Sequence, residues 1–267
     1  MNKDHWKIRQ FGKIPKLNRP IFIEGLPGIG NVGKIAIDFL IDEIKATKIY
    51  EINSYTFPHS VFVNEDNLVE LPIIEVFCKT FDGKRSDLIL LGGDVQPIDE
   101  VSCYEFSDIT LDLLEKMGCK ELITLGGIGL NEIPKKPKIY CTGNSKKAVG
   151  KYKSSLIQTN LYGVVGPIVG VSGLLLGLAS RRNMDAVSFL AETYGHPIYL
   201  GIKGAKELLK VIDTKFKLNL DINKLDREIK DIESELIKKT EQISEISKQI
   251  ALKKLQKRIG KDVDYIG

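Results

Sequence analysis

The chain has 267 residues, of which 43% are hydrophobic and 28% charged, and its formal net charge is +4. This length suits one large α/β domain with an appendage, and the apolar content is enough for a sizeable core. The small positive excess lies largely in the tails, so the composition argues against a partner that is nucleic acid.

Cysteine and histidine residues are too scattered to indicate a disulfide framework or a metal site. The sequence has three histidines and no C-x-x-C pair, and its four cysteines are Cys78, Cys103, Cys119 and Cys141. We therefore expect reduced thiols in the core of a cytoplasmic protein. The polar N-terminal segment also lacks the apolar run of a signal peptide.

The most distinctive segment runs from Pro20 to Lys34. A short apolar run predicts a buried strand at Ile21–Ile23, and apolar periodicity predicts a helix at Ile35–Ile44. Three of the glycines between them have the spacing of a binding motif: Gly28, Gly30 and Gly33. A strand, a glycine turn and a helix together can present backbone N–H groups and a positive helix end to an anion.

These glycines match two nucleotide-binding motifs in part. They fit G-x-G-x-x-G, and Glu51 ends the next apolar run, where an acidic ribose ligand is expected. They also fit G-x-x-x-x-G-K, except that Ile35 stands where a P-loop needs Ser or Thr. Glu24 would place negative charge beside a phosphate, and Pro27 lengthens the gap before the first glycine. We therefore expect the glycines to shape a turn and a close helix–sheet contact, and we predict no cofactor.

Further along the chain, short apolar runs alternate with helical patterns. The predicted strands are Lys48–Ile52, an edge strand at Val61–Val63, its hairpin partner Leu68–Phe77, Asp87–Leu91, Leu122–Leu125, Lys138–Cys141, Leu161–Val165 and the short run Pro197–Leu200. The predicted helices are Tyr104–Met117, Ser172–Arg181, Ala186–Tyr194 and one that begins at Lys206–Val211. This alternation predicts an α/β fold with a mostly parallel sheet covered by helices on both faces.

Glycine pairs follow two of the predicted strands, at Gly92-Gly93 and Gly126-Gly127. Such turns would line the carboxyl edge of a parallel sheet, where α/β proteins usually bind ligands. Asp94 and Glu132 are candidates for a carboxylate pair at this edge, although acids in turns are more often solvated.

The segment from Ser154 to Ser180 carries no charge and is long enough to span a bilayer. Pro167 and several glycines weaken a single continuous helix, however. We therefore expect no membrane span, but a strand that ends near Val165, a turn, and a buried helix from Ser172.

The composition changes near residue 216, where a helical extension begins. Its apolar residues are spaced alternately by three and four positions, with Lys239 at the one polar position of the pattern: Ile222, Leu225, Ile229, Ile232, Leu236, Ile243, Ile246 and Ile250. This is a heptad seam, which must pack either on another copy or back on its own body. We therefore divide the chain into a core at residues 1–215, a coiled-coil-like extension at 216–260 and a flexible tail at 261–267.

Known catalytic patterns are missing from the sequence. It contains no G-x-S-x-G, H-E-x-x-H, EF-hand loop or C-x-x-C motif. Ser172 lies in the nearest approach to a serine turn, but no motif ties a histidine to it. The sequence therefore favours a protein that is not an enzyme.

Five glycine-containing motifs occur in a fixed order along the chain. They are Glu24-Gly-Leu-Pro-Gly-Ile-Gly-Asn-Val-Gly33, Leu91-Gly-Gly-Asp94, Leu125-Gly-Gly-Ile-Gly129, Gly166-Pro-Ile-Val-Gly-Val-Ser-Gly-Leu-Leu175 and Ala191-Glu-Thr-Tyr-Gly-His-Pro197. As a set, this order resembles the archaeal branch of the proteasome assembly chaperone family, over roughly residues 10 to 215.

The resemblance implies a phosphorylase-like fold with no established catalytic site. It also implies a homo-oligomeric protein that acts without ATP and binds the α-subunit ring of the 20S proteasome. In that family a C-terminal hydrophobic–tyrosine–any-residue tail can dock between α subunits. The corresponding residues here are Tyr265, Ile266 and Gly267, which depart from the pattern because the tyrosine is third from last.

Two other functional classes remain as alternatives. One is a nucleotide- or nucleoside-binding enzyme that uses the glycine turns at the sheet edge. The other is a self-associating scaffold with no link to the proteasome.

Overall fold

The structure is a computed structural model of the chain, and it describes residues 5–64, 66–158 and 166–226. It divides into two compact units, residues 1–222 and 223–267, and only residues 223–226 of the second are described. The strands and helices below therefore belong to the first unit, except for the turn η2 (Ile222–Lys224), which begins at its last residue. The predicted boundaries at residues 215 and 260 stay predictions.

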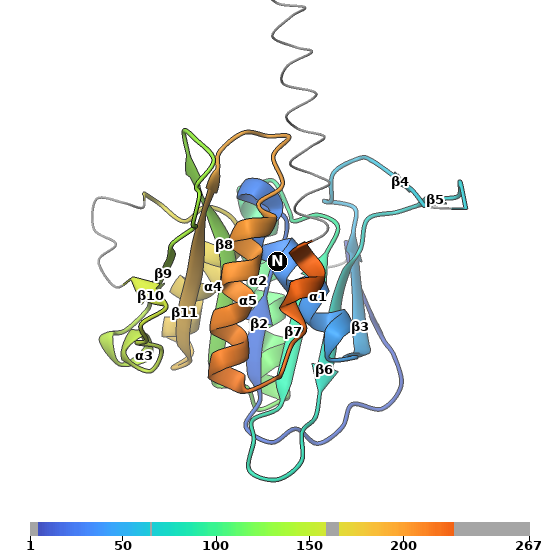
Figure 1. Ribbon diagram of the computed structural model, residues 1–267. Coiled ribbons are helices and arrows are strands. Elements are labelled where there is room, and N and C mark those ends of the chain that lie inside the picture. Colours follow the sequence, from blue (N-terminus) through green and yellow to red (C-terminus); the bar gives the residue numbers. More distant parts are fainter. Residues whose placement is uncertain (1–4, 65, 159–165, 227–267) are drawn as a thin grey trace, which may run out of the picture. The chain divides into compact units, whose positions relative to one another are not determined.

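A nine-stranded mixed sheet forms the centre of this unit (Figure 1). In spatial order its strands are β1 (Trp6–Gln10), β3 (Thr47–Ser54), β6 (Ile74–Lys79), β7 (Leu88–Gly93), β2 (Ile21–Glu24), β8 (Glu121–Leu130), β11 (Asp185–Tyr194), β9 (Ile139–Gly143) and β10 (Ile157–Gln158). The central strands β7, β2, β8 and β11 are parallel, as are β9 and β10 at one edge, and the other neighbours are antiparallel.

Helices cover both faces of the sheet, which confirms the predicted α/β class (Figure 1). One layer contains α1 (Val32–Glu43) and α5 (Ile202–Phe216), and the other contains α2 (Glu100–Lys116) and α4 (Val171–Arg181). The short helix α3 (Lys146–Gly150) lies beside β9 and β11. There are also two single turns, η1 (Ile29–Asn31) and η2 (Ile222–Lys224).

The central strands are apolar because helices bury them on both sides. Leu88, Ile89, Leu90 and Leu91 in β7 are fully buried, as is expected for parallel strands between two helical layers. Phe22 in β2 faces the core cluster that includes residues of α2 and α4.

Helix α2 begins four residues earlier than the periodicity predicts. The side chain of Asp99 accepts a hydrogen bond from the N–H of Ser102 and caps the helix, so the first turn forms without an apolar face. Gly118, with φ of 73°, ends the helix as expected.

The largest error in the sequence prediction concerns the segment Ala186–Tyr194, which is not a helix but the strand β11. Its apolar residues do not alternate because α4 and α5 cover β11 on its two faces, and such a run resembles a buried helix. The run Pro197–Leu200 is likewise not a strand but a turn. The sequence prediction also lacks β1, which pairs with β3.

The glycine pairs expected in turns lie inside strands. Gly92-Gly93 are the last residues of β7, and Gly126-Gly127 lie in the middle of β8. The segment predicted as one strand from Leu68 to Phe77 forms two, because Pro72 separates the short strand β5 (Val69–Glu70) from β6.

The predicted hairpin around residues 61–71 is confirmed, but not as part of the main sheet. Strand β4 (Phe62–Val63) pairs antiparallel with β5 in a separate two-stranded sheet. The hairpin leaves the body at the end of β3 and returns at the start of β6, and it projects at the right of Figure 1.

The segment around Ser154–Ser180 is only partly described. The predicted helix from Ser172 is confirmed as α4, whereas the strand expected near Val165 lies outside the described residues. Within residues 5–64, 66–158 and 166–226, every helix is too short or too polar to cross a bilayer.

Most of the predicted heptad seam also lies outside the described residues. Ile222 lies in η2, and Leu225 is buried. The remaining seam positions (Ile229, Ile232, Leu236, Ile243, Ile246 and Ile250) and the tail residues (Tyr265, Ile266 and Gly267) are not described.

Candidate functional site

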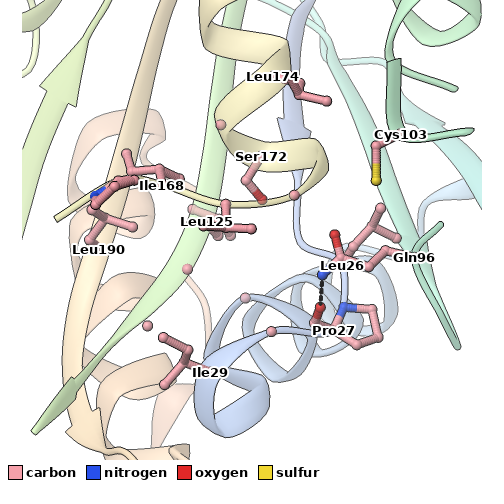
Figure 2. A pocket seen from close by; sticks show the side chains of 18 of the residues that line it. Leu26, Pro27, Ile29, Gln96, Cys103, Leu125, Ile168, Ser172, Leu174 and Leu190 are labelled. Carbon is pink, nitrogen blue, oxygen red and sulfur yellow. Dashed lines mark hydrogen bonds between the residues drawn. The ribbon is translucent and has the colours of Figure 1, made fainter. Parts of the chain in front are cut away.

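A cavity of about 920 Å³ opens at the carboxyl edge of the central strands (Figure 2). It lies among the loops after β2 and β7, the backbone of β8 and the start of α4. Its walls are mainly apolar and include Leu26, Ile29, Leu125, Ile168, Leu174 and Leu190. The volume falls in the range of about 300–1,000 Å³ that is usual for small-molecule sites.

Gln96 is one of the few polar side chains that line this cavity, and it ties two walls together. Its Nε2 donates to the carbonyl of Pro27 at 2.7 Å, which Figure 2 marks with a dashed line. Its Oε1 accepts from the N–H of Val171 at 3.3 Å, at the first turn of α4. Gln96 therefore fixes the loop after β2 against the N-terminus of α4.

A fully buried carboxyl group, that of Glu24, lies behind the cavity wall. Its Oε1 accepts from the N–H of Leu26 at 2.8 Å, and its Oε2 accepts from the hydroxyl of Ser172 at 2.9 Å. Burial raises the pKa of Glu24 from 4.5 to about 7, although both hydrogen bonds oppose this rise. Ser172 lines the cavity, so a carboxyl that titrates near neutrality contacts the cavity wall through one hydroxyl.

The charge of the cavity wall does not suit a phosphate. Among the described residues that line it, none is lysine, arginine or histidine, and Glu100 is the one acid. Phosphate sites normally supply positive charge or several converging N–H groups. The lining therefore suits an uncharged, largely apolar ligand better than a nucleotide.

Gly25, Gly30 and Gly33 are closely packed against neighbouring elements. We call residues 25–33 the glycine corner. A Cβ atom on Gly25 would collide with the carbonyl of Gly33, and one on Gly33 would collide with the carbonyl of Leu125 in β8. Gly30 has φ of 61°, and its carbonyl accepts from the N–H of Gly201 at the start of α5. The glycine corner thus joins β2, α1, β8 and α5 by direct backbone contact.

Gly28 differs from the other glycines of the motif. It lines the cavity, its φ is −158°, and a Cβ added there would meet no atom within 4 Å. Gly33 also lines the cavity, whereas Gly30 is not among the lining residues. Two of the three candidate cofactor residues therefore reach the cavity.

The strand order excludes the dinucleotide interpretation of the motif. In a dinucleotide-binding fold, the strand that carries the acidic ribose ligand lies next to the strand that precedes the glycines. Here Glu51 lies in β3, and two strands, β6 and β7, stand between β3 and β2. The Glu51 carboxylate forms an ion pair with Lys48.

The P-loop interpretation fails at the lysine. Lys34 Nζ donates to the carbonyl of Gly93 at 3.0 Å and pairs with Asp38 at 3.0 Å. The lysine is therefore directed to the end of β7, and it does not line the cavity.

The proposed carboxylate pair is not assembled either. Asp94 accepts from the N–H of Ile73 at 3.2 Å and lies 4.0 Å from Lys34, and Glu132 is exposed after β8. Within the described part of the chain, no interaction joins Asp94 to Glu132. The described residues also contain no group of three or more His, Cys, Asp or Glu side chains that could hold a metal ion.

All four cysteines are free and buried, as predicted. Cys103 lines the cavity, but its thiol donates to the carbonyl of Pro97 at 3.1 Å. Burial raises the pKa of Cys119 to about 11 and that of Cys141 to about 12, so neither thiol is activated as a nucleophile.

Sequence reasoning missed the link between Glu24 and Ser172, which are 148 positions apart. The available signal was an acidic residue at the end of an otherwise apolar run, because a carboxyl in that position must find donors when it is buried. The sequence gives no indication of where the donor lies.

Comparisons with known proteins now define the class. The model of the PAC2 family matches residues 22–239, and the chain belongs to this family. It is 30% identical over 238 residues to the uncharacterized protein MJ1210 of Methanocaldococcus jannaschii, a match that covers 88% of this chain and 89% of the relative. This membership confirms the family resemblance seen in the glycine motifs.

Two solved structures are similar over almost their whole length. Pyrococcus furiosus PbaB, described as an archaeal proteasome activator, is 33% identical with a TM-score of 0.81, and the match covers 89% of this chain and 99% of PbaB. Pyrococcus furiosus PbaA, described as an archaeal homolog of proteasome-assembly chaperone, is 25% identical with a TM-score of 0.68, and the match covers 91% of this chain and 99% of PbaA.

Proposed function

We propose that this chain is a proteasome-associated protein without catalytic activity, which assists assembly or activation of the particle. The observation that carries this proposal is the match to PbaB, at 33% identity over 89% of the chain. The site supports it indirectly, because the cavity wall lacks the cationic groups that phosphate chemistry would use.

The partner we propose is the α ring of the 20S proteasome, bound without ATP by a homo-oligomer of this chain. A peptide end with an aromatic anchor and a free carboxylate is suited to a pocket between subunits. The tail residues Tyr265, Ile266 and Gly267 are the candidates for this contact, with the heptad seam as the candidate for self-association.

The test is binding of full-length protein to purified α-subunit rings, measured by biolayer interferometry. Deletion of residues 265–267 should weaken binding on the order of tenfold or more, as is typical when a buried tyrosine anchor is lost. Deletion of Gly267 alone is the matched control, because it leaves Tyr265 in place and makes it penultimate. This control should bind at least as well as the full chain.

Two outcomes would contradict the proposal at different levels. Equal binding by the full chain and the chain without residues 265–267 would refute the role of the tail. Absence of binding by the full chain to either α rings or assembled particles would refute the association with the proteasome.

A further inference from the structure

The hairpin of β4 and β5 exposes an unusual concentration of apolar side chains. We call residues 61–64 and 66–71, the described part of this hairpin, the finger. Its exposed apolar residues are Val61 (52%), Phe62 (44%), Val63 (65%), Leu68 (62%), Val69 (69%) and Leu71 (71%). Neighbouring strand residues point to opposite sides, so the finger is apolar on both faces. Clustered exposure of this kind usually marks an interaction surface.

The finger is held in shape by its own turn. Asn64 Oδ1 accepts from the N–H groups of Asp66 and Leu68, and Asn67 takes a left-handed conformation with φ of 61°. Asn64 Nδ2 donates to Glu70 across the hairpin at 2.7 Å. A partner would therefore meet a preformed surface, which lowers the entropic cost of binding.

The finger is also acidic. The sequence from Asn53 to Pro72 contains three acids, Glu65, Asp66 and Glu70, and neither lysine nor arginine. A complementary surface would combine an apolar floor with positive charge at its rim.

A groove with this composition exists at the opposite edge of the same sheet. We call it the basic groove. It has a volume of about 410 Å³, and its lining residues are Ile21, Phe81, Arg85, Ser86, Leu88, Lys215, Phe216, Lys217 and Leu218. Five of these are large and apolar, three are cationic, and no acid is among them. The volume is sufficient for an anchor side chain or a small ligand.

Arg85 fixes the two walls of the basic groove. Its guanidinium donates to the carbonyls of Phe216 at 2.9 Å and Lys217 at 3.2 Å, and it lies 4.2 Å from the centre of the Phe81 ring. The segment after β6 is thereby joined to the end of α5, so the groove is a fixed feature of the fold.

The finger cannot reach the basic groove of its own chain. Ile21 and Leu88 begin β2 and β7 at the amino edge, whereas the finger leaves from the carboxyl edge, where Ile74 pairs with Gly93 at the end of β7. Any contact between these two surfaces must therefore join different copies of the chain.

We propose that the finger of one copy docks in the basic groove of a second copy, in a head-to-tail contact. One apolar face of the finger covers Phe81, Phe216 and Leu218, and Asp66 meets the cationic rim, where Lys217 is exposed. The two surfaces differ, so the contact is heterologous and extends to a ring or a filament. This inference does not depend on binding to the proteasome.

Disulfide trapping in the full-length chain tests the contact directly. Val69→Cys places a thiol on the finger and Leu218→Cys places one in the basic groove, while the four natural cysteines are buried. Under mild oxidation, the mixture of the two variants should form a covalent dimer, and neither variant should do so alone. The rate in the mixture should exceed either single rate on the order of tenfold, because only the mixture brings the two surfaces together.

The matched control replaces the finger thiol with Ile198→Cys, a residue that is 60% exposed outside the finger. Mixed with Leu218→Cys, it should link only at the background rate of random collision. Asp66→Lys on the Val69→Cys chain should slow linking by about twofold to fivefold, the range expected for an exposed ion pair. Lys217→Glu on the Leu218→Cys chain should restore the rate.

Two results would overturn the proposal. Linking by Val69→Cys alone, as fast as in the mixture, would show that two fingers pair with each other. Linking of the mixture no faster than the Ile198→Cys control, with both variants folded by circular dichroism, would show that the finger has another partner or none.

Discussion

The glycine corner and the finger leave the same edge of the sheet but are built in opposite ways. In the glycine corner, Gly25 and Gly33 bring backbone against backbone, and the Glu24 carboxyl beside it is completely buried. In the finger, large apolar side chains stand in solvent on both faces. In the glycine corner, which is the motif most similar to a ligand cradle, Gly25 and Gly33 serve backbone packing, whereas the less distinctive loop exposes the apolar surface that we propose to contact a second copy.

The largest effect should come from neutralising the buried acid with Glu24→Gln. The folded carboxyl keeps its proton to about pH 7, whereas an ordinary one releases it near 4.5. The unfolded state therefore holds fewer protons between these values, and the wild-type fold loses stability as the pH rises through this window. Above about pH 7 the variant should be more stable by about 3 kcal/mol, and near pH 4 the two should be equal.

Urea unfolding at several pH values measures this difference. If the difference in unfolding free energy between wild type and Glu24→Gln stayed constant across the pH range, the raised pKa of Glu24 would be contradicted. Asp99→Asn is a suitable control, because Asp99 caps α2 at the surface and should not reproduce a transition near neutrality.

A smaller effect should come from a methyl group added inside the glycine corner. Gly33→Ala directs a Cβ at the carbonyl of Leu125, which cannot move without shifting β8. The net loss of unfolding free energy should be about 2 kcal/mol. This figure already includes the gain of about 1 kcal/mol that alanine gives over glycine in helix propensity.

Gly28→Ala is the matched control for this prediction. A Cβ there meets open space and the backbone is extended, so the change should stay within about 0.5 kcal/mol. If Gly33→Ala and Gly28→Ala lost the same unfolding free energy in urea, the close backbone contact at Gly33 would not be the reason for the glycine there.

The smallest effect on stability should come from the finger. Val69 and Leu71 are 69% and 71% exposed, so the double substitution Val69→Ser and Leu71→Ser should change the unfolding free energy by no more than about 0.5 kcal/mol. The same variant should form smaller assemblies than the wild type in sedimentation velocity, because it loses the head-to-tail contact, whereas a contact through the heptad seam would remain. A loss of stability near 2 kcal/mol would instead mean that the finger packs on its own body.

Several features of the fold were predictable from local pattern. The apolar runs of β2 and β7 identify buried strands, because a strand covered on both faces has no polar positions. Periodicity identifies α1, α2 and α4, and the hairpin at residues 61–71 follows from two apolar runs around a polar turn. The class of protein followed from the ordered glycine motifs.

Other features depended on contacts that local pattern does not encode. β11 was predicted as a helix, because hydrophobic periodicity cannot distinguish a strand from a helix when nearly all ten residues of the run are buried. Glu51 stands in the sequence where an acidic ribose ligand would be expected, and only the strand order shows that β6 and β7 separate its strand from β2. Neither the hydrogen bond from Ser172 to Glu24 nor the basic groove can be read from residues so far apart along the chain.

The sequence by itself therefore determined the α/β class, the family and the segments with strong periodicity, since these depend on residues close together in the chain. Only the tertiary structure decided what the glycines do. Backbone from four elements meets in the glycine corner, and no lysine, arginine or histidine is among the described residues that line the cavity beside it. The motif therefore supports the fold. The finger, in contrast, exposes its apolar side chains.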